Sequence, residues 1–185
     1  LILSSNSSFV GDTTLLQQYS IHLLSEKIML NDNGYLYNNS SFVYESEPLA
    51  VYSFMPRPNV AEKMEIRLPD KLGQDLLTRF HNHDESVAVN HFEDYFKGIV
   101  IVPDVQQSYS LLSFQVSDSL SALVLHYHIE GGYENHQQLV FSPNTVTQFN
   151  QLTHDRLDTP MEPYPLKKVE IPSADLGNRG LLFAG

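Results

Sequence analysis

The stretch that decides the fold is "NHFEDYFKGIVIVPD", residues 90–104, because it changes from the periodicity of a helix to that of a strand. Asn90 favours the N-cap position of a helix, and Glu93, three residues on, can complete a capping box. Three aromatic residues would share one face of this helix at positions i, i+3 and i+4: Phe92, Tyr95 and Phe96. Gly98 favours the end of the helix, and "IVIVP" predicts an apolar strand that stops at Pro103.

Outward from this stretch, most of the chain has the period-2 alternation of half-buried strands, interrupted by Asn, Gly, Ser and Pro. Further strands are expected within residues 18–26, 49–58, 63–69 and 109–116, in a hairpin over 121–143 and at about 145–153. Gly131 and Gly132 mark the turn of that hairpin. A second helix is expected at about 70–80, because Leu72, Leu76 and Phe80 are spaced four apart behind Pro69.

The order of these elements predicts a mainly β protein. About eight strands with two short helices (about 70–80 and 90–97), and no alternation of strand and helix, favour an antiparallel jelly-roll-like β-sandwich. We expect residues 1–159 to form this sandwich and residues 160–185, with four prolines, to be an extended C-terminal segment. The opening "LILSSNSS" lacks a charged signal-peptide start, so we interpret the chain as part of a longer one with any targeting segment upstream.

Composition excludes several classes of function. With 11 Lys and Arg against 22 Asp and Glu, the net charge of −11 disfavours nucleic acid and anionic lipid as partners. The absence of Cys excludes disulfides, thiolate metal sites and a Cys nucleophile. No apolar run approaches the ~20 residues that span a bilayer. We expect no cofactor, and the sequence leaves the oligomeric state open.

Two groups of residues could ligate a metal. His126 and His128 lie two apart and so on one strand face, and His136 across the hairpin could supply a third nitrogen. The alternative is an ordinary solvent-facing side of a hairpin. The loop "FHNHDES" (80–86) also combines imidazole and carboxylate groups, but it has no known metal-site spacing and equally suits a solvated loop.

Candidate binding and catalytic residues are less defined. Tyrosines could stack on sugar rings or contact a protein partner, although strand packing is the alternative; the candidates are Tyr35, Tyr37, Tyr44 and Tyr133. Paired carboxylates could support glycoside hydrolysis, but six acids qualify and none is singled out: Glu45, Glu47, Glu93, Asp94, Glu130 and Asp155. No Gly-x-Ser-x-Gly elbow or phosphate loop is present.

Several segments in order resemble an uncharacterised family of lipoproteins from Bacteroides-type Gram-negative bacteria. They are "DTTLLQQYSIHLLSEKI", "IRLPDKLGQDLL", "HFEDYFKGIVIVPD", "LSALVLHYHIEG" and "TQFNQLTHDRLDTP", within about residues 10–160. The resemblance implies an upstream signal peptide with a lipidated Cys, and hence an outer-membrane address in the cell envelope. It implies no activity, and the roles of four matching residues stay open: Phe149, Asn150, His154 and Asp155.

The sequence therefore predicts a non-catalytic module of a cell-envelope lipoprotein that binds an envelope protein or a polysaccharide. The alternative is a glycan-active or metal-assisted hydrolase on the same β-sandwich. A purely structural part of an envelope assembly, docked through its Pro-rich C-terminal segment, is a third possibility.

Overall fold

A computed structural model describes residues 1–37, 40–57, 60, 63–88, 91–115, 121–128, 131–132, 134–140 and 150–151. The chain divides into two compact units. The first comprises Leu1–Lys27 with Val43–Val146, and the second comprises Ile28–Phe42 with Thr147–Gly185. The strands and helices described below belong to the first unit.

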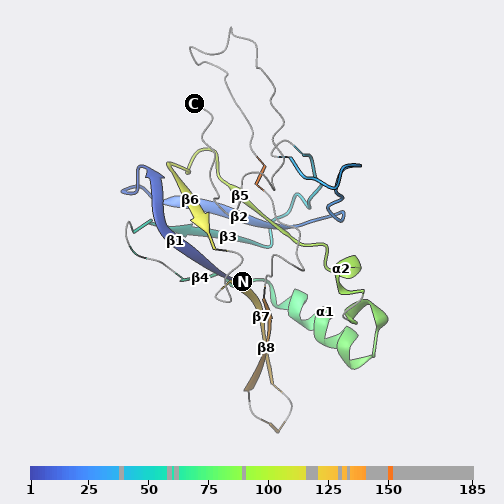
Figure 1. The fold of residues 1–185 in the computed structure, drawn as a ribbon. Coiled ribbons are helices and arrows are strands. Elements are labelled where there is room, and N and C mark those ends of the chain that lie inside the picture. Colours follow the sequence, from blue (N-terminus) through green and yellow to red (C-terminus); the bar gives the residue numbers. More distant parts are fainter. Residues whose placement is uncertain are drawn as a thin grey trace. The chain divides into compact units, whose positions relative to one another are not determined.

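One antiparallel sheet is organised around the first strand. Its members are β1 (Ile2–Gly11), β4 (Lys63–Glu65), β6 (Ser110–Phe114), β7 (Ala122–His128) and β8 (Glu134–Val140). The first residues of β1 pair with β4, and its last residues pair with β6 across an irregularity between Ser5 and Phe9. Strand β7 joins β1 at a single position, Ile2 opposite Ala122, and otherwise pairs with β8. Figure 1 shows β7 and β8 running together as a two-stranded ribbon.

A second antiparallel sheet has three strands in the order β3-β2-β5, with β2 (Gln17–Leu23) between β3 (Ala50–Phe54) and β5 (Ile99–Pro103). Ile21 lies opposite Ala50 on one side and Ile101 on the other. Along β2, Tyr19 and Ile21 are buried while Ser20 between them is half-buried, as expected for side chains that alternate between two faces. This alternation defines an inner and an outer face of the sheet.

The two sheets share one hydrophobic core. Its buried residues come from both sheets and from the chain beside them: Leu1, Leu3, Tyr19, Ile21, Phe54, Met64 and Ile66. The Tyr19 ring of β2 stacks on Phe54 of β3 at 5.7 Å and meets Phe114 of β6 edge-on at 6.1 Å, so aromatic contacts join the sheets. Burial of this apolar surface is the main source of stability for the unit.

The helices lie between the strands along the chain. They are α1 (Asp70–His81), the one-turn 3-10 helix η1 (Glu85–Val87) and α2 (Phe92–Tyr95). In the described residues no helix is long and apolar enough to cross a membrane.

The prediction of two short helices is confirmed, although α2 is shorter than the expected 90–97. Asn90 was expected as N-cap, but the helix begins at Phe92 with His91 in that position and without a side-chain cap. Asn90 itself lies outside the described residues. Gly98 was expected to end the helix, but α2 ends at Tyr95 with Phe96, in an extended conformation, as its C-cap. Gly98, with a φ of +124°, lies two residues beyond that cap.

The mainly β fold, with two antiparallel sheets, is confirmed; the jelly-roll strand order stays a prediction. The hairpin is also found, with Gly131 at a φ of +77° between its strands. The strand expected at 145–153 falls largely outside the described residues, as does the 160–185 segment, so the proposed division at residue 159 stays a prediction. Strand β1 was not expected.

Candidate functional site

The outer face of the β3-β2-β5 sheet is the candidate binding surface. Ser20 of β2 lies directly between Val51 of β3 and Val102 of β5. Gln18 and Ser53 form the neighbouring pair on the same face. Val51 is 54% exposed, although valine is among the residues most often buried in folded proteins.

The three strands contribute no Asp, Glu, Lys or Arg to this face, and Asp104, directly after β5, donates its backbone N–H to the Gln18 carbonyl at the edge of the sheet. The three strands read "QQYSIHL", "AVYSF" and "IVIVP", whereas the whole chain has a net charge of −11. Depletion of charged residues is a feature of the central part of a protein interface. The excess negative charge of the chain therefore lies outside these three strands.

One end of the face is organised by His22, which is only 7% exposed. A backbone carbonyl can only accept, so Nδ1 of His22 donates to the Glu45 carbonyl oxygen at 2.7 Å. Its Nε2 lies 2.9 Å from Ser20 Oγ, and in the neutral ring this nitrogen accepts from that hydroxyl. Tyr44 packs edge-on against the imidazole at 5.0 Å.

The Ser20–His22 contact resembles a nucleophile and its base in distance alone. The imidazole is buried beneath Tyr44, and both of its nitrogens are used in holding neighbouring chain segments. Its role is therefore structural, and Tyr44, which packs against the imidazole, is 37% exposed.

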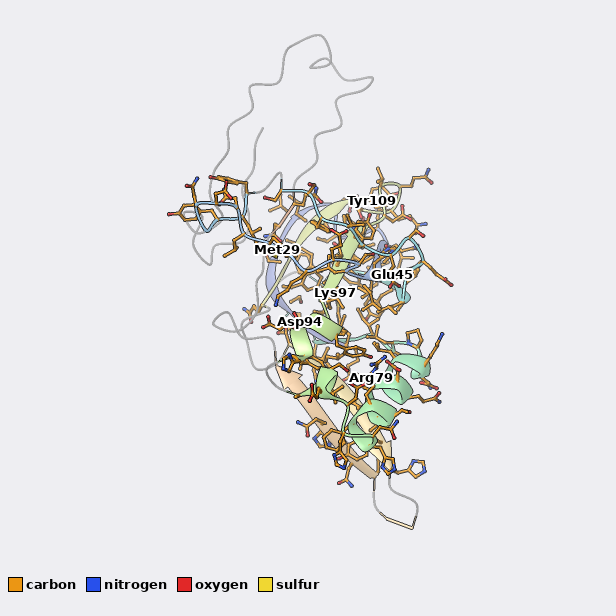
Figure 2. The ribbon with its side chains drawn as sticks, turned by 90° about the vertical axis from the view of Figure 1, so that its right-hand side faces the viewer. Met29, Glu45, Arg79, Asp94, Lys97 and Tyr109 are labelled. Atoms are coloured by element: carbon orange, nitrogen blue, oxygen red, sulfur yellow. The ribbon has the colours of Figure 1, made fainter. Side chains whose placement is uncertain are left out.

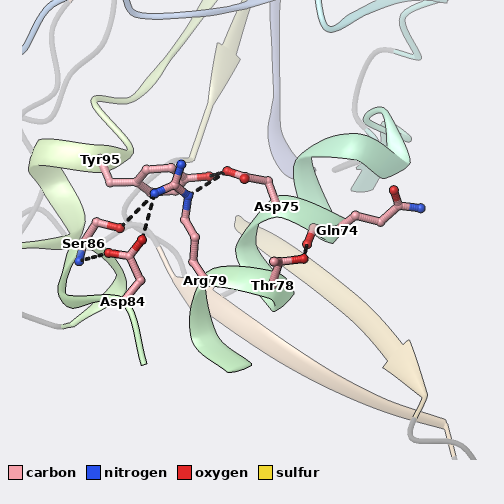
Figure 3. Close-up of polar contacts among 7 residues, drawn as sticks. All are labelled: Gln74, Asp75, Thr78, Arg79, Asp84, Ser86 and Tyr95. Atoms are coloured by element: carbon pink, nitrogen blue, oxygen red, sulfur yellow. Dashed lines mark hydrogen bonds and ion pairs between the residues drawn. The ribbon is translucent and has the colours of Figure 1, made fainter. Parts of the chain in front are cut away.

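A polar cluster joins α1, η1 and α2 around Arg79 (Figure 3). Its Nε donates to Asp75 Oδ2 at 2.9 Å, and its Nη1 donates to Asp84 Oδ2 at 3.1 Å and to Ser86 Oγ at 3.3 Å. The guanidinium also lies 4.6 Å from the centre of the Tyr95 ring, a cation–π distance. The Tyr95 hydroxyl donates to Asp75 Oδ2 at 2.5 Å, which closes the cluster.

Ionisation in this cluster follows from its contacts. Burial, and then the bond to Asp75, raise the pKa of Tyr95 to about 12. The hydrogen bond from Tyr95, followed by that from Arg79, lowers the pKa of Asp75. The pKa of Asp84 is lowered by the backbone and then the side chain of Ser86, with Arg79 adding to the effect. Each carboxylate is thus stabilised as an anion, which suits a structural clamp better than a proton donor.

Beside this clamp is a shallow, open depression of about 330 Å³, lined by Glu85, Ser86, His91, Asp94 and Tyr95. Two of the acids proposed for catalysis, Glu93 and Asp94, contact Lys27 Nζ at 3.1 and 3.5 Å. Lys97, labelled with Asp94 in Figure 2, donates to the Ser25 carbonyl at 2.8 Å. Lys27 and Lys97 together connect the α2 region with the residues after β2. These acids are therefore ion-paired at the surface.

The described residues do not test the proposed tyrosine surface. Tyr35 is 43% exposed and Tyr37 half-buried, and both belong to the Ile28–Phe42 segment of the second unit. Asn31 organises that segment, because its Oδ1 accepts from the backbone of Asn33 and Tyr35. Tyr44 lies in the first unit and Tyr133 lies outside the described residues, so the tyrosine site stays a prediction.

The three predicted metal ligands are only partly assembled. His126 and His136 face each other across the hairpin with ring centres 5.9 Å apart, whereas His128 pairs with Glu134. No group of three potential ligands positioned to hold a metal occurs among the described residues. In the 80–86 loop, Asp84 caps η1 by accepting from the Ser86 backbone at 2.9 Å, so one of its candidate ligands has a structural role.

Four residues that match the lipoprotein family have no assigned role. Among them, Asn150 is described without regular structure, and Phe149, His154 and Asp155 lie outside the described residues. Comparison with known proteins adds no further assignment: no family model, curated protein or solved structure matches the chain. The class of protein is therefore defined by its architecture, a mainly β chain with two antiparallel sheets.

Proposed function

We propose that the chain is a non-catalytic module of a cell-envelope lipoprotein, and that it binds an envelope protein through the outer face of the β3-β2-β5 sheet. The observation that carries this proposal is the uncharged face formed by the exposed Val51 and the half-buried Ser20 and Val102. A polysaccharide is the alternative ligand.

A protein partner is favoured by the shape and chemistry of the face. Stacking on sugar rings needs aromatic side chains presented together, whereas Tyr44, which packs on His22, is a single such ring. Valine and hydroxyl side chains on a pleated sheet instead offer apolar area with scattered hydrogen-bonding groups, as protein interfaces do. The net charge of −11 disfavours nucleic acid as the ligand.

The envelope address rests on the resemblance of five sequence segments to lipoproteins of Bacteroides-type bacteria. The expected lipid anchor belongs to an upstream segment, so the module would contact the membrane only through that anchor. An extracytoplasmic module that binds a neighbouring envelope component needs no catalytic group, and the carboxylates near α2 are used in ion pairs.

The test is capture of a ligand by the immobilised chain. Detergent-solubilised envelope and a separate polysaccharide fraction from a Bacteroides-type bacterium are passed over it, and bound material is identified by mass spectrometry. Val51→Glu places a charge on the outer face of a strand that pairs only with β2 among the described residues. The matched control is Val105→Glu, in the turn after β5, where the side chain is 93% exposed.

We expect the wild-type chain and Val105→Glu to retain one envelope protein at near-equal stoichiometry, and Val51→Glu to lose it. Circular dichroism would verify that both variants keep the β fold. Equal retention by the two variants would contradict the assignment of the face. Retention of polysaccharide without protein would contradict a protein partner and support the glycan alternative.

A further inference from the structure

The β7–β8 ribbon has a histidine pair that the proposed function does not use. His126 of β7 lies directly opposite His136 of β8. Their ring centres are 5.9 Å apart, and the ring planes are inclined at 37°. Residues directly opposite on neighbouring strands project to the same face of a sheet, so both imidazoles stand on one side of the ribbon.

This side faces away from the packing surface of the ribbon. The neighbouring position, Leu125, contacts α1 on the other face: a methyl group built at Gly73 would lie 2.9 Å from Leu125 Cδ1. Because side chains alternate along a strand, the histidines next to Leu125 and its partner Gln137 point the opposite way. Both imidazoles are accordingly exposed.

The imidazole nitrogens of the pair make no hydrogen bond to any described part of the chain. They are thus available as ligands, and neutral imidazole suits Zn²⁺, Cu²⁺ and Ni²⁺. With metal–nitrogen distances of about 2.0–2.1 Å, two nitrogens on one tetrahedral ion lie about 3.3 Å apart. Facing rings with centres 5.9 Å apart can place their near nitrogens at such a separation.

We propose that His126 and His136 form a cross-strand binding site for a divalent transition metal of the zinc and copper class. The pair supplies two ligands, and water or an external donor completes the coordination. His128 is not a ligand in this arrangement, because it lies two positions along the strand, about 7 Å away, opposite Glu134.

A bound ion would link β7 and β8 in the part of the ribbon where the two strands pair with each other. Beyond Ala122, β7 pairs only with β8 within the described residues, and an isolated two-stranded hairpin is marginally stable in water. A ligand that binds only the paired form stabilises it by mass action. The metal would therefore slow the opening of the ribbon.

The test titrates the whole chain with Zn²⁺ by calorimetry, with Mg²⁺ as the hard-ion comparison. The variants are His126→Gln, His136→Gln and, as the matched control on the same face, His128→Gln. We expect one Zn²⁺ per chain, no heat from Mg²⁺, and a loss of affinity of about tenfold or more in each of the first two variants. His128→Gln should bind within about threefold of wild type, because it leaves both ligands of the pair in place.

A second readout is hydrogen exchange of the β7 and β8 amides, which should slow with Zn²⁺ in the wild type and not in His126→Gln. Absence of Zn²⁺ binding by the wild type would overturn the proposal. So would unchanged binding by His126→Gln and His136→Gln, or a loss in His128→Gln as large as in His126→Gln.

Discussion

Replacing Ile21 with alanine tests the assignment of an inner and an outer face to the β3-β2-β5 sheet. The Ile21 side chain is fully buried and lies between Ala50 and Ile101 in the middle of the three-stranded sheet. The change removes three carbon atoms, and at about 0.8 kcal/mol for each buried methylene the lost transfer free energy is about 2.4 kcal/mol. The cavity that remains adds to this, so the free energy of unfolding should fall by about 3–4 kcal/mol.

The assay is urea unfolding followed by circular dichroism, with Val51→Ala as the matched control. Val51 lies on the opposite face of the same sheet and is 54% exposed, so its truncation should change the free energy of unfolding by about 0.5 kcal/mol or less. In thermal unfolding, Ile21→Ala should lower the Tm by about 6–16 °C for a chain of this length. Similar losses for Ile21→Ala and Val51→Ala would refute the assignment of inner and outer faces.

Three further predictions concern single contacts. The Tyr95 phenolate, measured as the difference in ultraviolet absorbance between wild type and Tyr95→Phe, should form at about pH 12. Because this pKa is raised above the ordinary value of about 10, the advantage of wild type in the free energy of unfolding should hold below about pH 10 and vanish as the pH rises through 12. A phenolate that forms near pH 10 would contradict this prediction. Gly98→Ala should lower the free energy of unfolding by about 1–3 kcal/mol, since its φ is +124° and the added methyl would lie 3.0 Å from Leu24 Cδ1. Gly34→Ala, whose added methyl would meet no atom within 4 Å, should lower it by less, and the reverse order would be inconsistent with the Leu24 contact. Gln17→Leu should cost about 1–3 kcal/mol in urea unfolding, because the fully buried amide oxygen accepts two backbone N–H bonds that would lose their partner, and an unchanged midpoint would argue against that role.

The elements that could be predicted from the sequence are those with local patterns. Alternating apolar residues and the glycine turn identified the β7–β8 hairpin, and the four-residue spacing behind Pro69 identified α1. Both patterns depend on neighbours within a few residues, so tertiary contacts do not alter them. Helix α2 is shorter than expected because the backbone of Phe96 is extended, which ends the helix after one turn although the Phe92 and Phe96 rings still stack at 5.7 Å.

Strand β1 could not be predicted because its first half is rich in serine. Ser4 and Ser5 are buried nonetheless, since neighbouring groups satisfy the backbone. The Ser4 N–H donates to Ser121 Oγ at 2.9 Å, and the Ser4 carbonyl accepts from the Gln115 N–H at 2.7 Å. These partners are more than a hundred residues away along the chain, so no local periodicity contains them.

The same limit applies to the candidate sites. The i, i+4 spacing of Asp75 and Arg79 could have indicated an ion pair on α1, but the contacts with Asp84 and Tyr95 depend on how η1 and α2 pack. The outer face around Val51 likewise appears only when the three strands are in register. His126 and His136 were expected near each other because a hairpin fixes its own register.

The most direct measurement of the proposed binding face uses the absence of cysteine from the chain. A single cysteine at Val51→Cys or at Val105→Cys can be labelled with a photoreactive maleimide and irradiated in the solubilised envelope fraction. If the outer face of the β3-β2-β5 sheet is the binding surface, residue 51 should give one discrete protein adduct and residue 105 should give none. An adduct of equal yield from both positions, or from residue 105 alone, would contradict the account.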